Sequence, residues 1–243
     1  MPRPGKNDIL RFDFPEGKTL ARKYIIEKQL GRGWEGEVYK VQEVKTGIPR
    51  AAKIYYPIRN PKGRTVNHYS RKLNRLSDCR IIMQYAHQDW FTYRRQSIEF
   101  LVSEYIEGEV LSEYVNRQPG RRLHYFEALH VLEALCRGMA TVHSAGEYHG
   151  DIHADNVMLR RKGLEFQVKL IDFFERPGSR RENIFEDTVD LIHVLYELIG
   201  GRRHYSKMPE QIKWLCCGLK RSLIRKKFRN AGQLYRALQN LGW

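Results

Sequence analysis

The stretch HGDIHADN, residues 149–156, gathers carboxylates, imidazoles and an amide within a few positions and is followed at once by an apolar run. A second apolar run, Val168–Phe173, contains Asp172. Mg²⁺ in proteins takes a few carboxylate or amide oxygens and completes its shell with phosphates and water. We therefore interpret Asn156 and Asp172 as magnesium ligands and Asp151 as the carboxylate that accepts a proton from a nucleophile. The alternative is an Asx-rich turn in which Asp151 caps locally.

Toward the N-terminus, the segment GRGWEGEVYK (residues 31–40) contains the glycine pattern Gly31, Gly33 and Gly36, followed by Val38. A dinucleotide-binding loop would need a helix directly after these glycines, and the residues that follow are typical of a strand. A strand–loop–strand hairpin suits a flap over phosphates, because glycine lets backbone N–H groups approach an anion. The alternative is an ordinary hairpin turn.

Lys53 lies inside the apolar segment AAKIY, twenty-two residues after Gly31. A lysine in such a strand is costly to bury unless it meets a negative group. A neighbouring strand would bring it beneath the glycine-rich hairpin, where phosphate oxygens are the expected partner. The alternative is a lysine on the open face of an edge strand.

The chain changes character near Gly108. Before it, β-branched and aromatic runs separated by turns predict strands, and after it apolar residues spaced by three or four predict helices. This order favours an α+β fold of two lobes, residues 24–106 and 107–243, after an N-terminal extension, residues 1–23. The expected strands are 24–30, 37–43, 50–56, 90–94 and 98–105, and the expected helices are 126–142, 190–199, 211–219 and 231–241.

Composition narrows the class of protein. With 243 residues and 42% hydrophobic residues, the chain is long and apolar enough for a sizeable core. It has no apolar run of transmembrane length and no apolar signal-peptide segment at its N-terminus. Its four cysteines show no zinc-type spacing, so we expect reduced thiols in a cytoplasmic protein.

The formal net charge of +15 favours an anionic partner. Residues 59–80 hold seven Lys or Arg against Asp78 alone, and residues 202–229 hold ten against Glu210 alone. We interpret these runs as solvated helix faces that could also meet an acidic protein substrate. A nucleic-acid partner is not favoured, because no RNP, zinc-finger or basic-zipper pattern accompanies them.

These motifs, in this order, resemble those of the protein-kinase-like superfamily from about residue 24 to the C-terminus. The resemblance rests on a glycine-rich loop, a strand lysine, a hinge, a catalytic loop and a metal-binding motif. In this sequence they are Gly31-x-Gly33-x-x-Gly36-x-Val38, Ala51-Ala52-Lys53, Glu104-Tyr105-Ile106, His149 to Asn156, and Asp172-Phe173-Phe174.

The resemblance implies ATP and Mg²⁺ as cofactors and Lys53, Asp151 and Asn156 as the catalytic set. Lys53 would hold the α- and β-phosphates, and Asp151 would orient and deprotonate the acceptor hydroxyl. Asn156 and Asp172 would hold the metal. The nucleotide would contact Gly31, Gly33, Gly36, Val38, Ala51, Lys53 and Met158, with hydrogen bonds to adenine from the Glu104 carbonyl and the Ile106 N–H.

Other positions take secondary roles under the same resemblance. Ser103 would be a small gatekeeper, and His149 a structural brace. Glu109 would reach the ribose. Asp190 would be the buried aspartate of the following helix that holds the backbone of the catalytic loop.

The sequence also departs from the family pattern. No acidic residue lies between Lys53 and Asp78, so the usual helix glutamate is absent and His68 or Tyr69 would lie near its position. DFF replaces DFG, and Gly150 replaces the arginine that commonly binds a phosphorylated activation loop. The segment between Asp172 and Asp190 is short and lacks the APE motif, which argues against switching by phosphorylation of that segment.

Three functions follow from this pattern. The preferred one is an active kinase that phosphorylates Ser or Thr hydroxyls of a protein. The second is a small-molecule phosphotransferase of the aminoglycoside or choline kinase type, which the sequence HGDIH favours because His153 stands where Ser/Thr kinases usually have lysine. The third is a nucleotide-binding pseudokinase, favoured by DFF and the missing glutamate.

Overall fold

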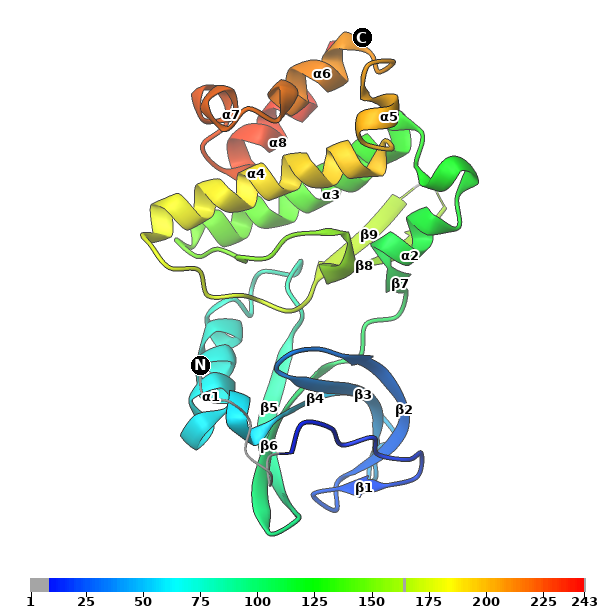
Figure 1. The fold of residues 1–243 in the computed structure, drawn as a ribbon, viewed down its shortest axis with the longest axis vertical. Coiled ribbons are helices and arrows are strands. Elements are labelled where there is room, and N and C mark those ends of the chain that lie inside the picture. Colours follow the sequence, from blue (N-terminus) through cyan, green and yellow to red (C-terminus); the bar gives the residue numbers. More distant parts are fainter. Residues whose placement is uncertain (1–8, 164, 243) are drawn as a thin grey trace. The chain divides into compact units, whose positions relative to one another are not determined.

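Residues 9–163 and 165–242 are described by the structure, a computed structural model (Figure 1). The chain divides into two units, which are described separately. The first comprises the described part of Met1–Asp78 together with Met83–Ile106, and the second comprises Cys79–Ile82 and the described part of Glu107–Trp243. Residues 1–8 of the predicted N-terminal extension lie outside the described residues.

The first unit is built on one antiparallel sheet of six strands (Figure 1). Every strand expected in this part of the sequence forms, because β-branched and aromatic side chains fit a pleated, half-buried surface. In sheet order the strands are β1 (Thr19–Leu20), β2 (Tyr24–Arg32), β3 (Gly36–Glu43), β4 (Pro49–Tyr55), β6 (Gln96–Glu104) and β5 (Tyr85–Tyr93).

One face of this sheet forms the hydrophobic core of the first unit. Side chains alternate along each strand, and residues directly opposite one another share a face. Tyr39 pairs with Ala52, and Ala52 pairs with Val102, and all three side chains are buried in one core cluster. The other members of this cluster are Ile9, Phe12, Phe14, Leu20, Tyr24, Ile26, Val41, Ile54, Tyr56, Ile98 and Phe100.

The segment before β1 belongs to this core. Phe12 stacks on Tyr56 with ring centroids 5.4 Å apart. The fully buried Glu37 carboxylate accepts hydrogen bonds from the Phe12 N–H at 2.9 Å and the Tyr56 hydroxyl at 3.0 Å. The described part of the predicted extension is therefore held to the sheet by apolar packing and by hydrogen bonds to a buried charge.

A single α-helix, α1 (Arg64–Arg75), accompanies the sheet in the described part of the first unit. Two short 3-10 turns, η1 (Pro57–Arg59) and η2 (Pro61–Gly63), lead into it. The Asn60 side-chain oxygen accepts the N–H groups of Thr65 and Val66, which satisfies donors that the first turn of a helix leaves open.

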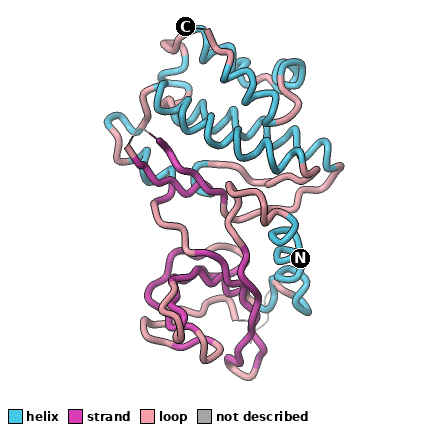
Figure 2. The backbone as a smooth tube through the Cα atoms, turned by 180° about the vertical axis from the view of Figure 1, so that it is seen from behind, coloured by secondary structure: helices cyan, strands magenta, loops and turns pink. Residues whose placement is uncertain are grey.

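The second unit is mainly helical, as Figure 2 shows, with a small sheet in the order β7-β8-β9. Leu170 also forms a parallel bridge with Ile82. The elements are β7 (Glu109–Val110), α2 (Leu111–Asn116), η3 (Pro119–Arg121), α3 (Tyr125–Ser144), η4 (Ala154–Asn156), β8 (Val157–Lys162), β9 (Glu165–Leu170), α4 (Arg180–Leu198), α5 (Arg202–Tyr205), α6 (Glu210–Cys216), η5 (Cys217–Leu219), α7 (Arg221–Lys227) and α8 (Ala231–Gln239).

The long helices α3 and α4 lie side by side in this unit (Figure 1). The start of α3 is close to the prediction, whereas α4 begins at Arg180, ten residues before the predicted start. The helix begins there because the Ser179 hydroxyl oxygen accepts the N–H of Glu182 at 3.2 Å. This is the hydrogen bond of an S-x-x-E capping pattern, which is visible in the sequence. The short segment after Asp172 therefore passes directly into a helix.

Two predictions made from composition can be compared with the described residues. All four cysteines are buried and form no disulfide. Among residues 9–163 and 165–242, no helix is both long enough and apolar enough to span a bilayer.

Candidate active site

The open face of the first sheet collects the residues predicted to bind nucleotide. Val38 pairs with Lys53, and Ala51 pairs with Ser103, so all four side chains lie on one face, opposite the aromatic core. The side chains of Val38, Ala51 and Lys53 are half-buried. The sheet register therefore brings together three of the predicted contacts, although they lie far apart in sequence.

The glycine-rich loop is the turn between β2 and β3. The Gly33 N–H donates to the Gly36 carbonyl at 2.9 Å, which closes the hairpin. A Cβ at Gly31 or Gly33 would meet no atom within 4 Å, so the backbone there is open to a ligand. A Cβ at Gly36 would overlap the Ile54 carbonyl oxygen of β4. Gly36 is thus required by packing against the neighbouring strand.

Lys53 is held by groups from the first unit. Its ammonium lies 2.8 Å from the carboxylate of Glu35, which stands at the tip of the glycine-rich loop. The same ammonium lies 5.1 Å from the centre of the Tyr69 ring on α1 and 5.5 Å from that of Tyr55. His68 or Tyr69 was predicted to lie near the position of the absent helix glutamate, and Tyr69 is the one whose ring the structure places beside Lys53. The Glu35 carboxylate belongs to a residue that the sequence interpretation missed.

The predicted hinge lies at the end of β6. Ser103, the proposed gatekeeper, is 2% exposed and lies one residue before Glu104. The Glu104 N–H donates to the Gln84 carbonyl at 3.0 Å, and its carboxylate accepts the Gln84 N–H at 2.8 Å. These bonds fix the backbone of the strand that carries the predicted adenine contacts.

In the second unit, one buried aspartate holds the backbone of the catalytic loop through hydrogen bonds. Asp187 of α4 accepts the N–H of His149 at 2.6 Å and that of Gly150 at 2.8 Å, and it is fully buried. The prediction that Asp190 has this role is wrong. Asp190 lies almost one helical turn further along and instead forms an ion pair with Arg176 at 2.7 Å.

His149 braces the loop from inside, as predicted. It is fully buried, its Nδ1 accepts the Asp151 N–H at 3.2 Å, and its Nε2 donates to the Ile171 carbonyl at 3.0 Å. The ring also lies against Phe173, with centroids 4.6 Å apart. His149 therefore ties the catalytic loop to the strand end that precedes Asp172.

The carboxylate of Asp151 is presented at the surface of this loop. The Asn156 amide donates to its Oδ2 at 3.0 Å and to its carbonyl at 2.9 Å. His153 Nε2 lies 3.5 Å from the same Oδ2. About half of the Asp151 side chain is exposed, so the carboxylate is oriented by its neighbours and open to a substrate.

Asn156 and Asp172 are suited to magnesium by their donor chemistry. Because the Asn156 amide nitrogen donates to Asp151, its side-chain oxygen is left for a cation. The Ile171 N–H donates to the Asn156 carbonyl at 3.0 Å, which places the residue before Asp172 beside Asn156. Among the described residues no cluster of three or more His, Cys, Asp or Glu forms a metal site by itself. Mg²⁺ in proteins is typically coordinated by one or two protein oxygens, and phosphates and water complete its coordination shell.

Gly150 and Phe174, both departures from the family pattern, are in contact. The Phe174 N–H donates to the His149 carbonyl at 3.1 Å, and a Cβ at Gly150 would overlap the Phe174 carbonyl oxygen. Gly150 also has a φ of +93°, which disfavours other residues. A side chain at position 150 is therefore incompatible with this path of the backbone after Asp172.

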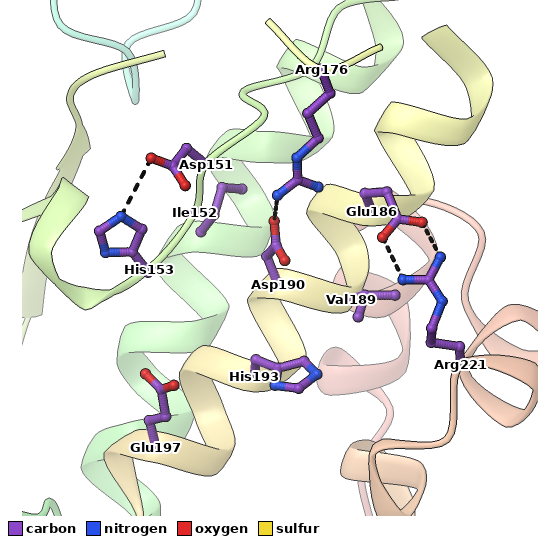
Figure 3. Close-up of a pocket in the computed structure, with 10 residues that line it drawn as sticks. All are labelled: Asp151, Ile152, His153, Arg176, Glu186, Val189, Asp190, His193, Glu197 and Arg221. Atoms are coloured by element: carbon purple, nitrogen blue, oxygen red, sulfur yellow. Dashed lines mark hydrogen bonds and ion pairs between the residues drawn. The ribbon is translucent and has the colours of Figure 1, made fainter. Parts of the chain in front are cut away.

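A cavity of about 470 Å³ adjoins the catalytic loop in the second unit (Figure 3). Asp151 and His153 lie on one side of it, and the Arg176–Asp190 pair lies across from them (Figure 3). Burial raises the pKa of Asp190 to about 6, and the nearby Arg176 guanidinium opposes this effect. Glu197 also lines the cavity.

Two predicted contacts lie in the small sheet of the second unit. Met158 is in β8 and half-buried. Glu109 is in β7, where its carboxylate pairs with Arg117, so its predicted bond to a ribose would need that pair to open.

Several basic residues of the run at residues 202–229 have partners inside the chain. Arg221 and Arg225 of α7 pair with Glu186 and Glu182 of α4. The Lys227 ammonium donates to the Trp214 carbonyl at 2.9 Å. These residues join helices within the unit and are not simply a solvated face.

Sequence comparison finds similarity to serine/threonine-protein kinases. The chain is 30% identical over 162 residues to CBL-interacting serine/threonine-protein kinase 13 of Arabidopsis thaliana, covering 65% of this chain and 30% of that protein. It is 26% identical over 222 residues to the serine/threonine-protein kinase PkaA of Streptomyces coelicolor, covering 76% and 40%. The chain thus spans less than half the length of these curated relatives.

A solved structure shares the fold. The kinase domain of PknI from Mycobacterium tuberculosis, in a double-mutant form, superposes with a TM-score of 0.69 at 18% identity, over 95% of this chain and 99% of that one. The predicted α+β fold, a strand-rich lobe followed by a helical lobe, is confirmed. The family model described as "Protein kinase domain" matches residues 24–179, more than half of the chain. This chain therefore belongs to the protein kinase domain family.

Proposed function

We propose that this chain is an ATP- and Mg²⁺-dependent kinase that phosphorylates serine or threonine hydroxyls of a protein. The observation that carries the proposal is the catalytic loop, whose backbone is fixed by Asp187 and whose Asp151 carboxylate is oriented by Asn156. Lys53 and Asp172 supply the remaining groups that phosphoryl transfer needs. A chain that only binds nucleotide has no chemical need for all four groups, Lys53, Asp151, Asn156 and Asp172.

In the proposed reaction, the acceptor hydroxyl oxygen attacks the γ-phosphorus while the Asp151 carboxylate accepts its proton. The bond from the γ-phosphorus to the bridging oxygen breaks, and ADP leaves. Lys53 and the backbone of the glycine-rich loop hold the phosphates. When bound by Asn156 and Asp172, magnesium supplies positive charge to the phosphate oxygens. Val38, Ala51 and Met158 are the proposed apolar contacts of adenine, and the Glu104 carbonyl and the Ile106 N–H are its proposed hydrogen-bond partners.

The test is intact-mass spectrometry after incubation with MgATP and a generic acceptor protein. Wild type should add a phosphoryl group to itself or to the acceptor, and Asp151→Asn should lose this transfer while still binding ATP. The matched control is Asp155→Asn, because Asp155 is in the same loop and is largely exposed. Transfer by Asp151→Asn at the wild-type rate would contradict the proposed role of Asp151.

A second variant tests the metal site. We expect Asp172→Ala to abolish transfer and to remove the dependence of nucleotide affinity on Mg²⁺, because it deletes one of two protein oxygens proposed to bind the metal. Calorimetric titration with ATP, with and without Mg²⁺, measures this directly. An unchanged Mg²⁺ effect in the variant would remove Asp172 from the site.

Small-molecule phosphotransfer is the second candidate, because α4 begins only seven residues after Phe173 and leaves a short segment for binding a peptide. ATP binding without transfer to any protein, together with phosphorylation of a small hydroxyl acceptor, would favour it. ATP binding without either transfer or hydrolysis would favour a pseudokinase. We further propose a cytoplasmic location, which the buried, unbridged thiols support.

A further inference from the structure

The helix that usually supplies a carboxylate to the strand lysine cannot do so in this chain. The sequence of α1, RTVNHYSRKLNR, contains no acidic residue, and its Tyr69 presents an aromatic ring to Lys53 at 5.1 Å. A carboxylate from outside this helix contacts the Lys53 ammonium: that of Glu35, at 2.8 Å. The side chains of Lys53 and Glu35 are 15% and 23% exposed, so solvent screens this pair less than it screens an ion pair at the surface.

The position of Glu35 is set by the backbone of the loop. The Tyr56 N–H donates to the Glu35 carbonyl at 2.9 Å, which ties the loop tip to the end of β4. The adjacent Gly36 lies so close to the Ile54 carbonyl that no side chain fits there. Together these contacts hold Glu35 beside the strand that carries Lys53.

The residue before Glu35 is fixed as well. The Arg59 guanidinium lies over the Trp34 ring, 3.7 Å from its centre, although the Trp34 side chain itself is exposed. A cation over an aromatic face is attracted by the ring quadrupole. The loop tip is therefore held on both sides of Glu35, which lowers the entropy that Glu35 loses when it pairs with Lys53.

We propose that Glu35 is the positioning residue for Lys53, in place of a helix glutamate. An ammonium has three N–H donors, so it can bond Glu35 and a phosphate oxygen at the same time. Because the loop carries both this carboxylate and the N–H groups proposed to cradle phosphate, one element places the lysine and covers the anion. Alignment of the lysine then depends on the glycine-rich loop and not on a movement of α1. This inference rests on the proposed nucleotide-binding role of Lys53.

The experiment compares Glu35→Gln with wild type for affinity toward MgATP and toward adenosine. We expect MgATP affinity and kcat/KM to fall about tenfold, the size of a lost hydrogen bond to a charged group, and adenosine affinity to stay unchanged. Adenosine lacks phosphates, so a general loss of structure would weaken both ligands. The matched control is Glu27→Gln, which removes a carboxylate paired with Lys40 at 2.6 Å on the same sheet.

A rescue variant separates positioning from other effects. Adding Tyr69→Glu to Glu35→Gln puts a carboxylate on α1 beside Lys53, and we expect it to restore MgATP affinity toward the wild-type value. Unchanged or tighter MgATP binding by Glu35→Gln, or an equal loss for adenosine, would overturn the inference. If wild type binds MgATP but transfers no phosphoryl group, the proposed function fails, while the two affinities still decide the role of Glu35.

Discussion

Asp187 and Asp190 stand three residues apart on α4 and meet different surroundings. Asp187 is fully buried and accepts two backbone N–H groups of the catalytic loop. Asp190 faces Arg176 and lines the cavity beside that loop. Their sequence neighbourhood does not distinguish them, because either position could face the loop until the helix start and rotation are known. This is why the sequence pattern indicated the wrong aspartate.

Asp190 gives a testable pH dependence of stability. Its folded-state pKa of about 6 lies above the ordinary value of 3.8, so the folded protein binds the extra proton between these values. Ionisation of Asp190 therefore lowers stability as pH rises from about 3.8 to about 6, and the loss is complete above that range. We therefore expect the Tm of Asp190→Asn minus that of wild type to be higher at pH 7.5 than at pH 5, by a few degrees.

Thermal unfolding of both proteins at the two pH values measures this difference. Asp78→Asn is the control, because Asp78 is an exposed carboxylate whose loss should change Tm equally at both pH values. A difference for Asp190→Asn that does not vary with pH would contradict the assignment.

Glu35 shows a second limit of sequence interpretation. The missing acid on α1 was visible in the sequence, and so was the aromatic residue that faces Lys53. The partner carboxylate was not, because its approach depends on the loop conformation set by Gly36 and by the Tyr56 N–H. Such a contact follows from backbone geometry and not from residue spacing.

At the scale of elements, the catalytic loop and the segment after Asp172 form one packed arrangement through Gly150 and Phe174. We expect Gly150→Ala to lose about 1–2 kcal/mol from its positive φ and about a further 1–3 kcal/mol from overlap with the Phe174 carbonyl. Because the overlap displaces the loop that carries Asp151, phosphoryl transfer should fall as well. Chemical denaturation and the mass-spectrometric transfer assay measure the two effects.

Gly146→Ala is a matched control for this variant. Gly146 also has a positive φ, +71°, but a Cβ there would meet no atom within 4 Å. It should therefore show the conformational penalty alone and keep its transfer activity. Equal losses of stability in the two variants would remove the packing contribution from the explanation.

The elements were predictable to different degrees. Strand alternation and helical spacing predicted most of them, since burial of one face dictates both patterns. The start of α4 was missed because the prediction followed apolar spacing and overlooked Ser179 and Glu182, whose capping pattern marks the first turn. Local hydrogen bonding, not hydrophobic periodicity, sets that boundary.

At the scale of the whole molecule, the family match starts at residue 24, whereas the core of the first unit starts earlier. Phe12 is 5% exposed and packs against three other aromatic rings. We expect Phe12→Ala to lower the free energy of unfolding by about 3–5 kcal/mol, the range for deleting a buried aromatic side chain. Urea denaturation followed by tryptophan fluorescence measures the change.

Leu10→Ala is the control, because Leu10 lies in the same segment and is 48% exposed. Its substitution should change stability by no more than about 0.5 kcal/mol. Similar values for the two variants would mean that the segment contributes little to the core. The sequence did not reveal this packing, because short aromatic runs without periodicity do not indicate which sheet they cover.

The contact between Gly150 and Phe174 also limits how the sequence can change in evolution. A descendant of this chain that acquired a side chain at position 150 would also need another backbone path at position 174, since a Cβ at position 150 and the Phe174 carbonyl oxygen cannot occupy the same space. A relative with an arginine at the position of Gly150 should therefore have a metal-binding segment that follows another path, whichever residue stands at the position of Phe174.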